Sequence, residues 1–281
     1  MGVSGCLLGD GSPPIEALGR YVEWVPVCLE REAARLARGE KRARWIDPLH
    51  AWAVERARAL DVHGAILREE TPVCCLGRVG LHPARGGTAR VPFGSNGAGL
   101  LAAAFTATHP LVPVEEERRL RDRERRVHFL ERVFAWARLR ALLDAPFTPA
   151  RLQAFHAAHK YQLLAHSPAG YRELGRLVAA RSLPPAEQLA RYATTFMEML
   201  SRPATRGRQA NVLQHILGHF RGALDAADRE EALEQIDAYR RGIVPLAVPL
   251  TLLRHFARKH GDGWLRRQTY LAPMPLELLY G

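Results

Sequence analysis

Short apolar runs alternate with helical patterns in the first part of the chain. Residues 2–8, 22–27 and 62–67 are predicted strands, because each is a short apolar run that ends at a turn residue or a polar residue. Residues 29–38, 47–59 and 100–109 have helical spacing, with Asp47 as an N-cap and Pro48 at the first helical position. Alternation of strands and helices predicts a parallel α/β sheet.

The pattern changes near residue 115, where strand signals end and helical spacing continues. Thr148-Pro149 and Ser167-Pro168 are cap-plus-proline helix starts, and Asp225 begins another cap. We therefore predict an α/β N-terminal domain with a small parallel sheet at residues 1–114, and an all-α helical bundle domain at residues 115–281. The helices are expected at residues 118–144, 148–166, 168–181, 185–201, 208–224, 228–241 and 246–260.

Composition is that of a soluble globular protein, with 47% hydrophobic and 25% charged residues in 281. The N-terminus lacks a basic region followed by an apolar stretch, so no signal peptide is expected. The longest apolar stretch, residues 243–253, contains Pro245 and Pro249 and is too short to span a bilayer. A cytoplasmic, reducing location follows, in which four cysteines are expected to be free, metal-bound or catalytic rather than disulfide-bonded. Nothing in the sequence indicates an oligomeric state.

The net charge of +11 is concentrated in the C-terminal half. Residues 1–120 hold 15 basic and 14 acidic residues, whereas residues 147–281 hold 18 and 11. A genome rich in G and C explains the preference for arginine over lysine, but it does not explain the uneven distribution. A strongly basic half favours a polyanionic partner, with nucleic acid ahead of membrane.

Three cysteines, Cys6, Cys28 and Cys74, each follow a short apolar run. A parallel sheet would deliver residues at such positions from several strand ends to one crevice. Three thiolates can hold an iron–sulfur cluster and leave one iron open to a substrate atom. Buried free cysteines are one alternative, and zinc is another, although the paired C-x-x-C spacing of zinc sites is absent. Adjacent Cys74 and Cys75 point in different directions on an extended chain, so only one would face the metal.

Several carboxylates flank these cysteines and are candidates for a general acid or base. They are Glu23, Glu30, Glu69 and Glu70, of which Glu30, two residues after Cys28, is preferred. The glycine-rich residues 96–99 precede a predicted helix and could cradle a phosphate, but a structural turn explains such a short motif as well.

Two polar stretches stand out in the helical half. His156, His159 and Lys160 share a helix face by spacing, followed by Tyr161 and His166. Asn211, His215 and His219 form an i, i+4, i+8 stripe, and Arg206 and Arg208 near the helix start would suit a phosphate. A buried hydrogen-bond network between helices is the alternative interpretation of the stripe. A histidine-only metal site ranks lower, because no carboxylate completes it.

Residues 1–110 resemble the thiouracil desulfidase family. Its members carry Cys-Leu-Leu-Gly, Val-Pro-Val-Cys-Pro-Glu and Ser-Pro-Ser-Cys-Gly around three cluster-binding cysteines, and the corresponding strings here begin at Cys6, Val25 and Thr71. Residues 120–281 resemble a helical, YbgA-like domain of unknown function that is often fused to it. The matching strings there include His159-Lys160-Tyr161, Pro203-Ala204-Thr205-Arg206 and Asn211-Val212-Leu213-Gln214-His215.

This resemblance implies a desulfidase that converts 4-thiouridine in tRNA to uridine. It implies that Cys6, Cys28 and Cys74 bind a [4Fe-4S] cluster, with Glu30 assisting a water that replaces sulfur. The helical domain would hold the RNA, and the expected RNA-binding residues are Lys160, Tyr161, Arg206, Arg208, Asn211 and His215.

The sequence also departs from the family pattern. Leu29 stands in place of the proline after the second cysteine, Val73 in place of the serine before the third, and Cys75 in place of the glycine after it. The segment between Cys6 and Cys28 is shorter than in the family. Two alternatives therefore stay open: a catalytically degenerate protein that binds RNA or another protein, and a desulfidase of free 2-thiouracil.

Overall fold

The computed structural model describes residues 1–4, 18–27, 46–69, 74–76 and 99–280, and the chain divides into two compact units, Met1–Trp136 and Ala137–Gly281. Within the described residues, no helix combines the length and apolar character needed to cross a membrane. The predicted cytoplasmic location stays a prediction.

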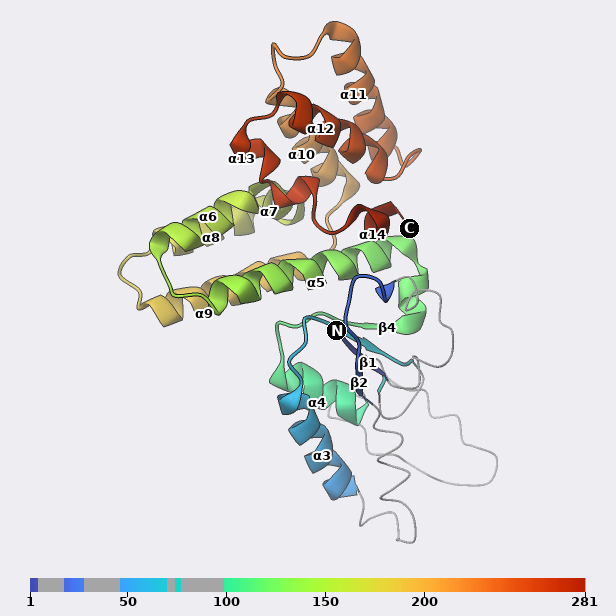
Figure 1. Ribbon diagram of the computed structural model, residues 1–281, viewed down its shortest axis with the longest axis vertical. Helices are drawn as coiled ribbons and strands as arrows, with labels where there is room; N and C mark the ends of the chain where they lie inside the picture. The colour runs from blue at the N-terminus through green and yellow to red at the C-terminus, as the bar shows by residue number, and fades with distance from the viewer. Residues whose placement is uncertain (5–17, 28–45, 70–73, 77–98, 281) are drawn as a thin grey trace. The chain divides into compact units, whose positions relative to one another are not determined.

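The first unit is built on a four-stranded sheet. The strands are β1 (Gly2–Ser4), β2 (Val25–Val27), β3 (Ala65–Leu67) and β4 (Val114–Glu116), in the order β2-β1-β3-β4 with every neighbouring pair parallel. Figure 1 shows the strands of this unit together with helices α3 and α4, which are described below. The first three strands and the parallel sheet are confirmed; β2 and β3 are shorter than predicted, and residues 5–8 of the first predicted strand lie outside the described residues. The central strand β3 is a continuous apolar run and is buried throughout, as expected for a strand covered on both faces.

Two helices in this unit pack against each other, α3 (Ile46–Ala59) and α4 (Leu100–Thr108). Ala53 and Ala57 of α3 are completely buried, because their small side chains allow α4 to approach closely. Both helices were predicted from the sequence. The predicted helix at residues 29–38 lies outside the described residues.

The fourth strand was missed by the sequence analysis. Residues 114–116 are Val-Glu-Glu, which lacks the apolar run that signals a strand. Tertiary pairing with β3 nevertheless fixes them in the sheet, with Leu67 opposite Glu116. The sheet therefore continues two residues beyond the predicted domain boundary at residue 114, and that boundary itself stays a prediction.

The remainder of the described chain is helical. After the 3-10 helix η3 (Glu117–Arg121), α5 (Arg123–Leu143) forms within the predicted range 118–144. The second unit then contains helices whose bounds are α6 (Pro149–Ala158), α7 (Lys160–His166), α8 (Pro168–Ala179), α9 (Pro185–Ser201), α10 (Arg206–Gly218), α11 (Ala226–Arg240), α12 (Ala247–His260), α13 (Gly263–Arg266), η4 (Thr269–Leu271) and α14 (Leu276–Tyr280). An all-helical second half is confirmed.

Three of the four predicted caps form as expected, whereas the predicted N-cap Asp47 lies inside α3, which begins at Ile46. Thr148, Ser167 and Asp225 each accept a hydrogen bond from the backbone N–H three residues later. One predicted helix is wrong in its continuity, because residues 148–166 divide into α6 and α7 at His159. The backbone of His159 has φ −96° and ψ 7°, outside the range of a regular helix.

Candidate functional site

All four strands of the sheet end at one level, because Ser4 pairs with Val27 and Leu67 pairs with Glu116. The register of β1 and β3, in which Val3 lies opposite Ile66, places these two pairs side by side. Cys28 follows Val27 directly in the sequence, and Cys6 comes two residues after Ser4. Cys6, Cys28 and Glu30 themselves lie outside the described residues. Their predicted roles therefore stay predictions.

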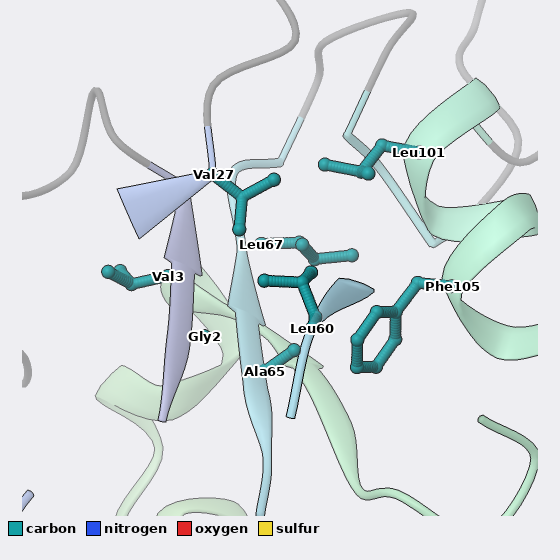
Figure 2. Close-up of a pocket in the computed structure, with 8 residues that line it drawn as sticks. All are labelled: Gly2, Val3, Val27, Leu60, Ala65, Leu67, Leu101 and Phe105. Atoms are coloured by element: carbon teal, nitrogen blue, oxygen red, sulfur yellow. The ribbon is translucent and has the colours of Figure 1, made fainter. Parts of the chain in front are cut away.

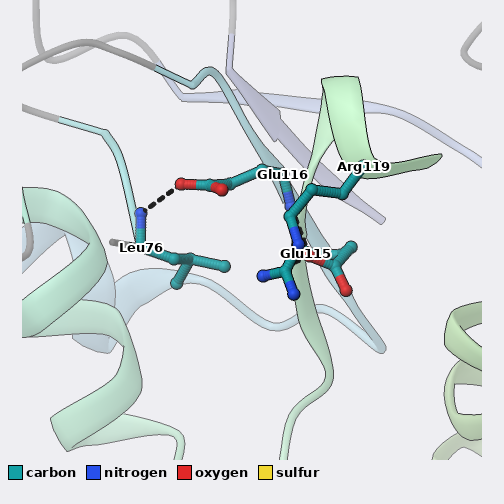
Figure 3. A network of polar contacts seen from close by, with 4 residues as sticks. All are labelled: Leu76, Glu115, Glu116 and Arg119. Atoms are coloured by element: carbon teal, nitrogen blue, oxygen red, sulfur yellow. Dashed lines mark hydrogen bonds and ion pairs between the residues drawn. The ribbon is translucent and has the colours of Figure 1, made fainter. Parts of the chain in front are cut away.

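The third predicted ligand, Cys74, lies in the described segment at residues 74–76. Cys74 and Cys75 are each only 2% exposed. The segment is held at two points: the Gly99 N–H donates to the Cys75 carbonyl at 2.8 Å, and the Leu76 N–H donates to Glu116 Oε1 at 2.7 Å. Figure 3 shows the Glu116 carboxylate reaching Leu76 from the end of β4. The third cysteine segment is thus tied to the carboxyl end of a strand.

Cys75 has the character of a structural thiol. Burial raises its pKa above the ordinary value, and the nearby Glu116 carboxylate adds to the rise, while a hydrogen bond from Gly99 opposes it. A thiol with a raised pKa is a weak nucleophile and a weak metal ligand at neutral pH. Which of the two adjacent cysteines would face a metal stays a prediction.

Of the predicted donor set for an iron–sulfur cluster, only Cys74 lies among the described residues, so the cluster stays a prediction. Cysteine thiolates are the usual protein ligands of such clusters. Cys74 is buried in a segment tied to the sheet edge, and the other two predicted ligands follow strands that end at the same edge. Within the described part of the chain, no three His, Cys, Asp or Glu side chains gather into a metal-binding group. The predicted set would be completed by Cys6 and Cys28, which lie outside it.

Glu116 is the residue at this edge that sequence reasoning missed. Its side chain is 6% exposed, although an ionised glutamate is rarely buried without a partner. Among the predicted acids, Glu69 lies at the surface with 32% of its side chain exposed, 3.7 Å from the Arg118 guanidinium. A glutamate in a strand that was itself missed left no signal in the sequence.

Replacing Glu116 with alanine should loosen the Cys74–Leu76 segment. The Leu76 N–H would lose a charged acceptor, which costs about 1.5–3 kcal/mol of stability. Glu116→Gln keeps an acceptor oxygen at the same place and serves as the control. We expect the cysteines of metal-free Glu116→Ala to react at least several times faster with a thiol reagent than those of Glu116→Gln. Equal rates in the two variants would show that the carboxylate does not hold the segment.

A small pocket in the first unit lies between the sheet and α4 (Figure 2). It is lined only by apolar residues and glycine, including Val3 of β1, Leu67 of β3 and Phe105 of α4. With no polar group to orient a ligand, the pocket belongs to the packing of the core.

In the helical unit, the predicted stripe on α10 lies at the surface. Asn211, His215 and His219 are exposed, together with Arg208. The opposite side of the helix is buried and includes Val212, Leu213 and Ile216. Asn211 and His215 therefore do not belong to a buried network, whereas His219 does make a hydrogen bond to another helix, as the alternative interpretation expected.

The stripe meets Lys160 and Tyr161 at its C-terminal end. The Tyr161 hydroxyl is hydrogen-bonded to His219 Nε2 at 2.6 Å, and the His219 ring stacks on Trp264 with centroids 5.5 Å apart. The Lys160 ammonium lies 5.3 Å from the centroid of Trp264 and 5.5 Å from that of Tyr161. Tyr161 is buried, and burial raises its pKa, so its hydroxyl stays protonated. Tyr161 thus positions His219, and Trp264 is a second residue that the sequence analysis missed.

The two arginines at the start of α10 contact different helices. The Arg208 guanidinium donates to the His166 carbonyl at 2.9 Å, at the end of α7. The Arg206 guanidinium lies over the Tyr239 ring of α11, 5.4 Å from its centroid. Both arginines are exposed; Arg208 lies toward α7 and Arg206 toward α11.

His156 and His159 have structural roles. The His156 ring stacks on Tyr171 and is hydrogen-bonded to the Tyr192 hydroxyl at 3.2 Å. His159 donates from Nδ1 to the Phe155 carbonyl at 2.7 Å and accepts at Nε2 from Arg138 Nε at 3.3 Å. Burial, followed by the charge of Arg138, lowers the pKa of His159 to about 3. The predicted face of His156, His159 and Lys160 is divided at His159: His156 and His159 lie close enough for their charges to interact, whereas Lys160 begins α7 and lies over Tyr161 and Trp264.

Comparison with known proteins identifies relatives of the helical half. Residues 160–275 match the family described as "Protein of unknown function (DUF1722)". The chain is 35% identical over 150 residues to the "Uncharacterized protein YbgA" of Escherichia coli strain K12, which covers 52% of this chain and 88% of that protein. No solved structure matches. Neither description mentions an activity or a cofactor, so the desulfidase resemblance gains no support from them.

Proposed function

This chain belongs to the DUF1722 family, and we propose that its N-terminal unit makes it an iron–sulfur-cluster-dependent desulfidase of thiolated uracil, with 4-thiouridine in tRNA as substrate. The observation that carries the proposal is the common carboxyl edge of the parallel sheet. Two of the predicted cysteines follow strands that end there, and the segment of the third is bound to β4 at the same edge.

Cys6, Cys28 and Cys74 would hold the cluster. When bound, such a cluster supplies a Lewis-acidic iron with an open position that polarises a thiocarbonyl group. Glu30 would take a proton from the water that adds to the thiocarbonyl carbon. The carbon–sulfur bond then breaks and sulfide leaves, so oxygen replaces sulfur without net oxidation. Glu116 would act indirectly, by holding the Cys74 segment in place.

The helical unit supports an RNA substrate over a free base. Arg208, Asn211 and His215 are exposed along α10, beside a lysine held over aromatic rings. A target base within folded RNA must be extruded into the reactive pocket, and the enzyme has to bind the flanking nucleotides for this. A free 2-thiouracil would need none of this surface.

The test is sulfide release from thiolated tRNA and from free 2-thiouracil, using anaerobically reconstituted protein. We expect release from the tRNA and little from the free base. Cys28→Ser should abolish release and leave RNA binding intact. If Cys28→Ser binds RNA like the wild type, and the wild type releases no sulfide from either substrate, the protein is a binding protein and the proposed activity is wrong. Turnover on free base alone would move the substrate assignment to 2-thiouracil.

A further inference from the structure

Acidic residues are absent from three long segments of the helical unit. Residues 145–172, 199–224 and 238–261 contain no Asp or Glu, although each carries several basic residues. The helices in these segments are α6, α7, α10 and α12, and α10 packs against both α7 and α12. Most acids of this unit lie instead on α8, α9 and α11. α10 also packs against the acid-rich α11, so the acid-free surface is confined to α10 and its neighbours α7 and α12, where it favours a polyanion over an acidic or neutral partner.

An aromatic platform lies beside this acid-free region, where the end of α10 meets α7 and α13; the nearest acid in the sequence is Asp262, which caps α13 by accepting a hydrogen bond from the Leu265 N–H. We define the platform as His219 and Trp264, which stack with an interplanar angle of 29°, together with Lys160 beside Trp264. His219 is exposed, and Lys160 and Trp264 are half-buried. Among the described residues, no carboxylate is ion-paired with Lys160.

The platform is rigidly built. The buried Tyr161 fixes the His219 ring through its hydroxyl, and Tyr161 also meets Trp264 edge-on with centroids 5.8 Å apart. His219 is the C-cap of α10, so its position follows that of the exposed stripe. A pre-organised aromatic surface beside an unpaired cation and a polar stripe is how proteins bind single-stranded nucleic acid: bases stack on the rings and phosphates meet the cations.

We propose that the platform stacks an unpaired nucleotide of an RNA whose backbone follows the α10 stripe. Lys160 would meet the phosphate beside the stacked base, and Arg208 and His215 would contact the backbone further along. Only the identity of this RNA as tRNA rests on the proposed desulfidase function. The site should bind single-stranded RNA more tightly than duplex RNA, because both faces of a base in a duplex are already stacked on its neighbours.

The magnitudes follow from each contact. Loss of one stacked base costs about 1–3 kcal/mol, which is about a 5- to 150-fold loss of affinity. Loss of one phosphate contact lowers the salt dependence of binding by about one unit of slope and weakens all sequences alike.

The experiment measures the affinity of the full chain for a labelled single-stranded RNA and for a duplex RNA by fluorescence anisotropy, over a range of salt. The wild type should prefer the single strand. Trp264→Leu should bind the single strand about 5- to 150-fold more weakly than the wild type. Trp264→Phe keeps an aromatic ring and should bind it nearly as tightly as the wild type. Lys160→Gln should reduce the salt slope by about one, whereas Arg229→Gln, the same charge change on the acid-rich α11, should reduce it much less.

Three outcomes would overturn the inference. The first is that Trp264→Leu binds the single strand as tightly as the wild type when both melt at the same temperature. The second is that Lys160→Gln and Arg229→Gln reduce the salt slope equally. The third is an RNA affinity that does not change with salt. The last of these would point to a protein partner. Because binding is measured without turnover, the expected pattern together with absent sulfide release would refute the desulfidase function alone.

Discussion

Cys74→Ser should lose its iron and all sulfide-releasing activity, while Cys75→Ser keeps both. The two cysteines are adjacent and equally buried, so the pair separates a ligand role from a packing role. A serine hydroxyl replaces a thiolate ligand poorly. At position 75 burial raises the pKa of the thiol, so the thiol is held neutral, and a serine hydroxyl can keep the hydrogen bond from Gly99. We expect at least a 100-fold difference in sulfide release between the two variants, together with a difference in iron content after reconstitution.

The measurement needs a control for folding. Both variants should keep the helical content and the RNA affinity of the wild type, because the RNA-binding residues proposed above lie in the other unit. Loss of iron in both variants to the same degree would contradict the assignment of Cys74 as the ligand. Loss of iron in Cys75→Ser alone would mean that Cys75 is the ligand and Cys74 the packing residue.

His159 should make the helical unit less stable as the pH falls below neutrality. Its pKa is about 3 in the folded protein and near 6.5 in the unfolded chain, so the unfolded state takes up the proton first. Its contribution is therefore complete above pH 6.5 and is lost progressively toward pH 3. Each pH unit in this range costs about 1.4 kcal/mol, or about 2 kcal/mol between pH 6.5 and 5.0. Burial also lowers the pKa of His156, and this adds to the loss.

Urea unfolding followed by circular dichroism at several pH values tests this prediction. His159→Gln removes the titrating group and should flatten the decline in the free energy of unfolding by about 2 kcal/mol over the same range. His215→Gln alters an exposed histidine of α10 and should leave the decline as it is in the wild type. An unchanged pH dependence in His159→Gln would mean that His159 is not held neutral by its surroundings.

Elements whose signals are local were predictable. The helix at residues 185–201 forms as α9 with the same bounds, because its apolar residues recur on one face and include Tyr192, Phe196 and Leu200. The three caps with Ser, Thr or Asp formed because a cap depends only on residues within one turn.

Elements fixed by distant contacts were not predictable. The interruption at His159 depends on hydrogen bonds of its ring to both Phe155 and Arg138. Strand β4 exists because its charged residues pair with β3, which lies far from it in the sequence. Local patterns carry neither kind of information.

The same distinction applies to the candidate sites. Cys74 and the α10 stripe could be proposed from the sequence, because residue type and spacing suggest their chemistry. Glu116 and Trp264 were missed, because each acquires its role from a partner in a different part of the chain: Leu76 for Glu116, and His219 and Lys160 for Trp264.

The most direct measurement compares iron-loaded and iron-free protein, prepared from one sample, in a single turnover on thiolated tRNA. The proposed cluster held by Cys6, Cys28 and Cys74 predicts that the loaded protein releases one sulfide per thiolated base and that the metal-free form releases none. Equal release by both forms would contradict a role for the metal. No release by protein that carries its full complement of iron would contradict the activity itself.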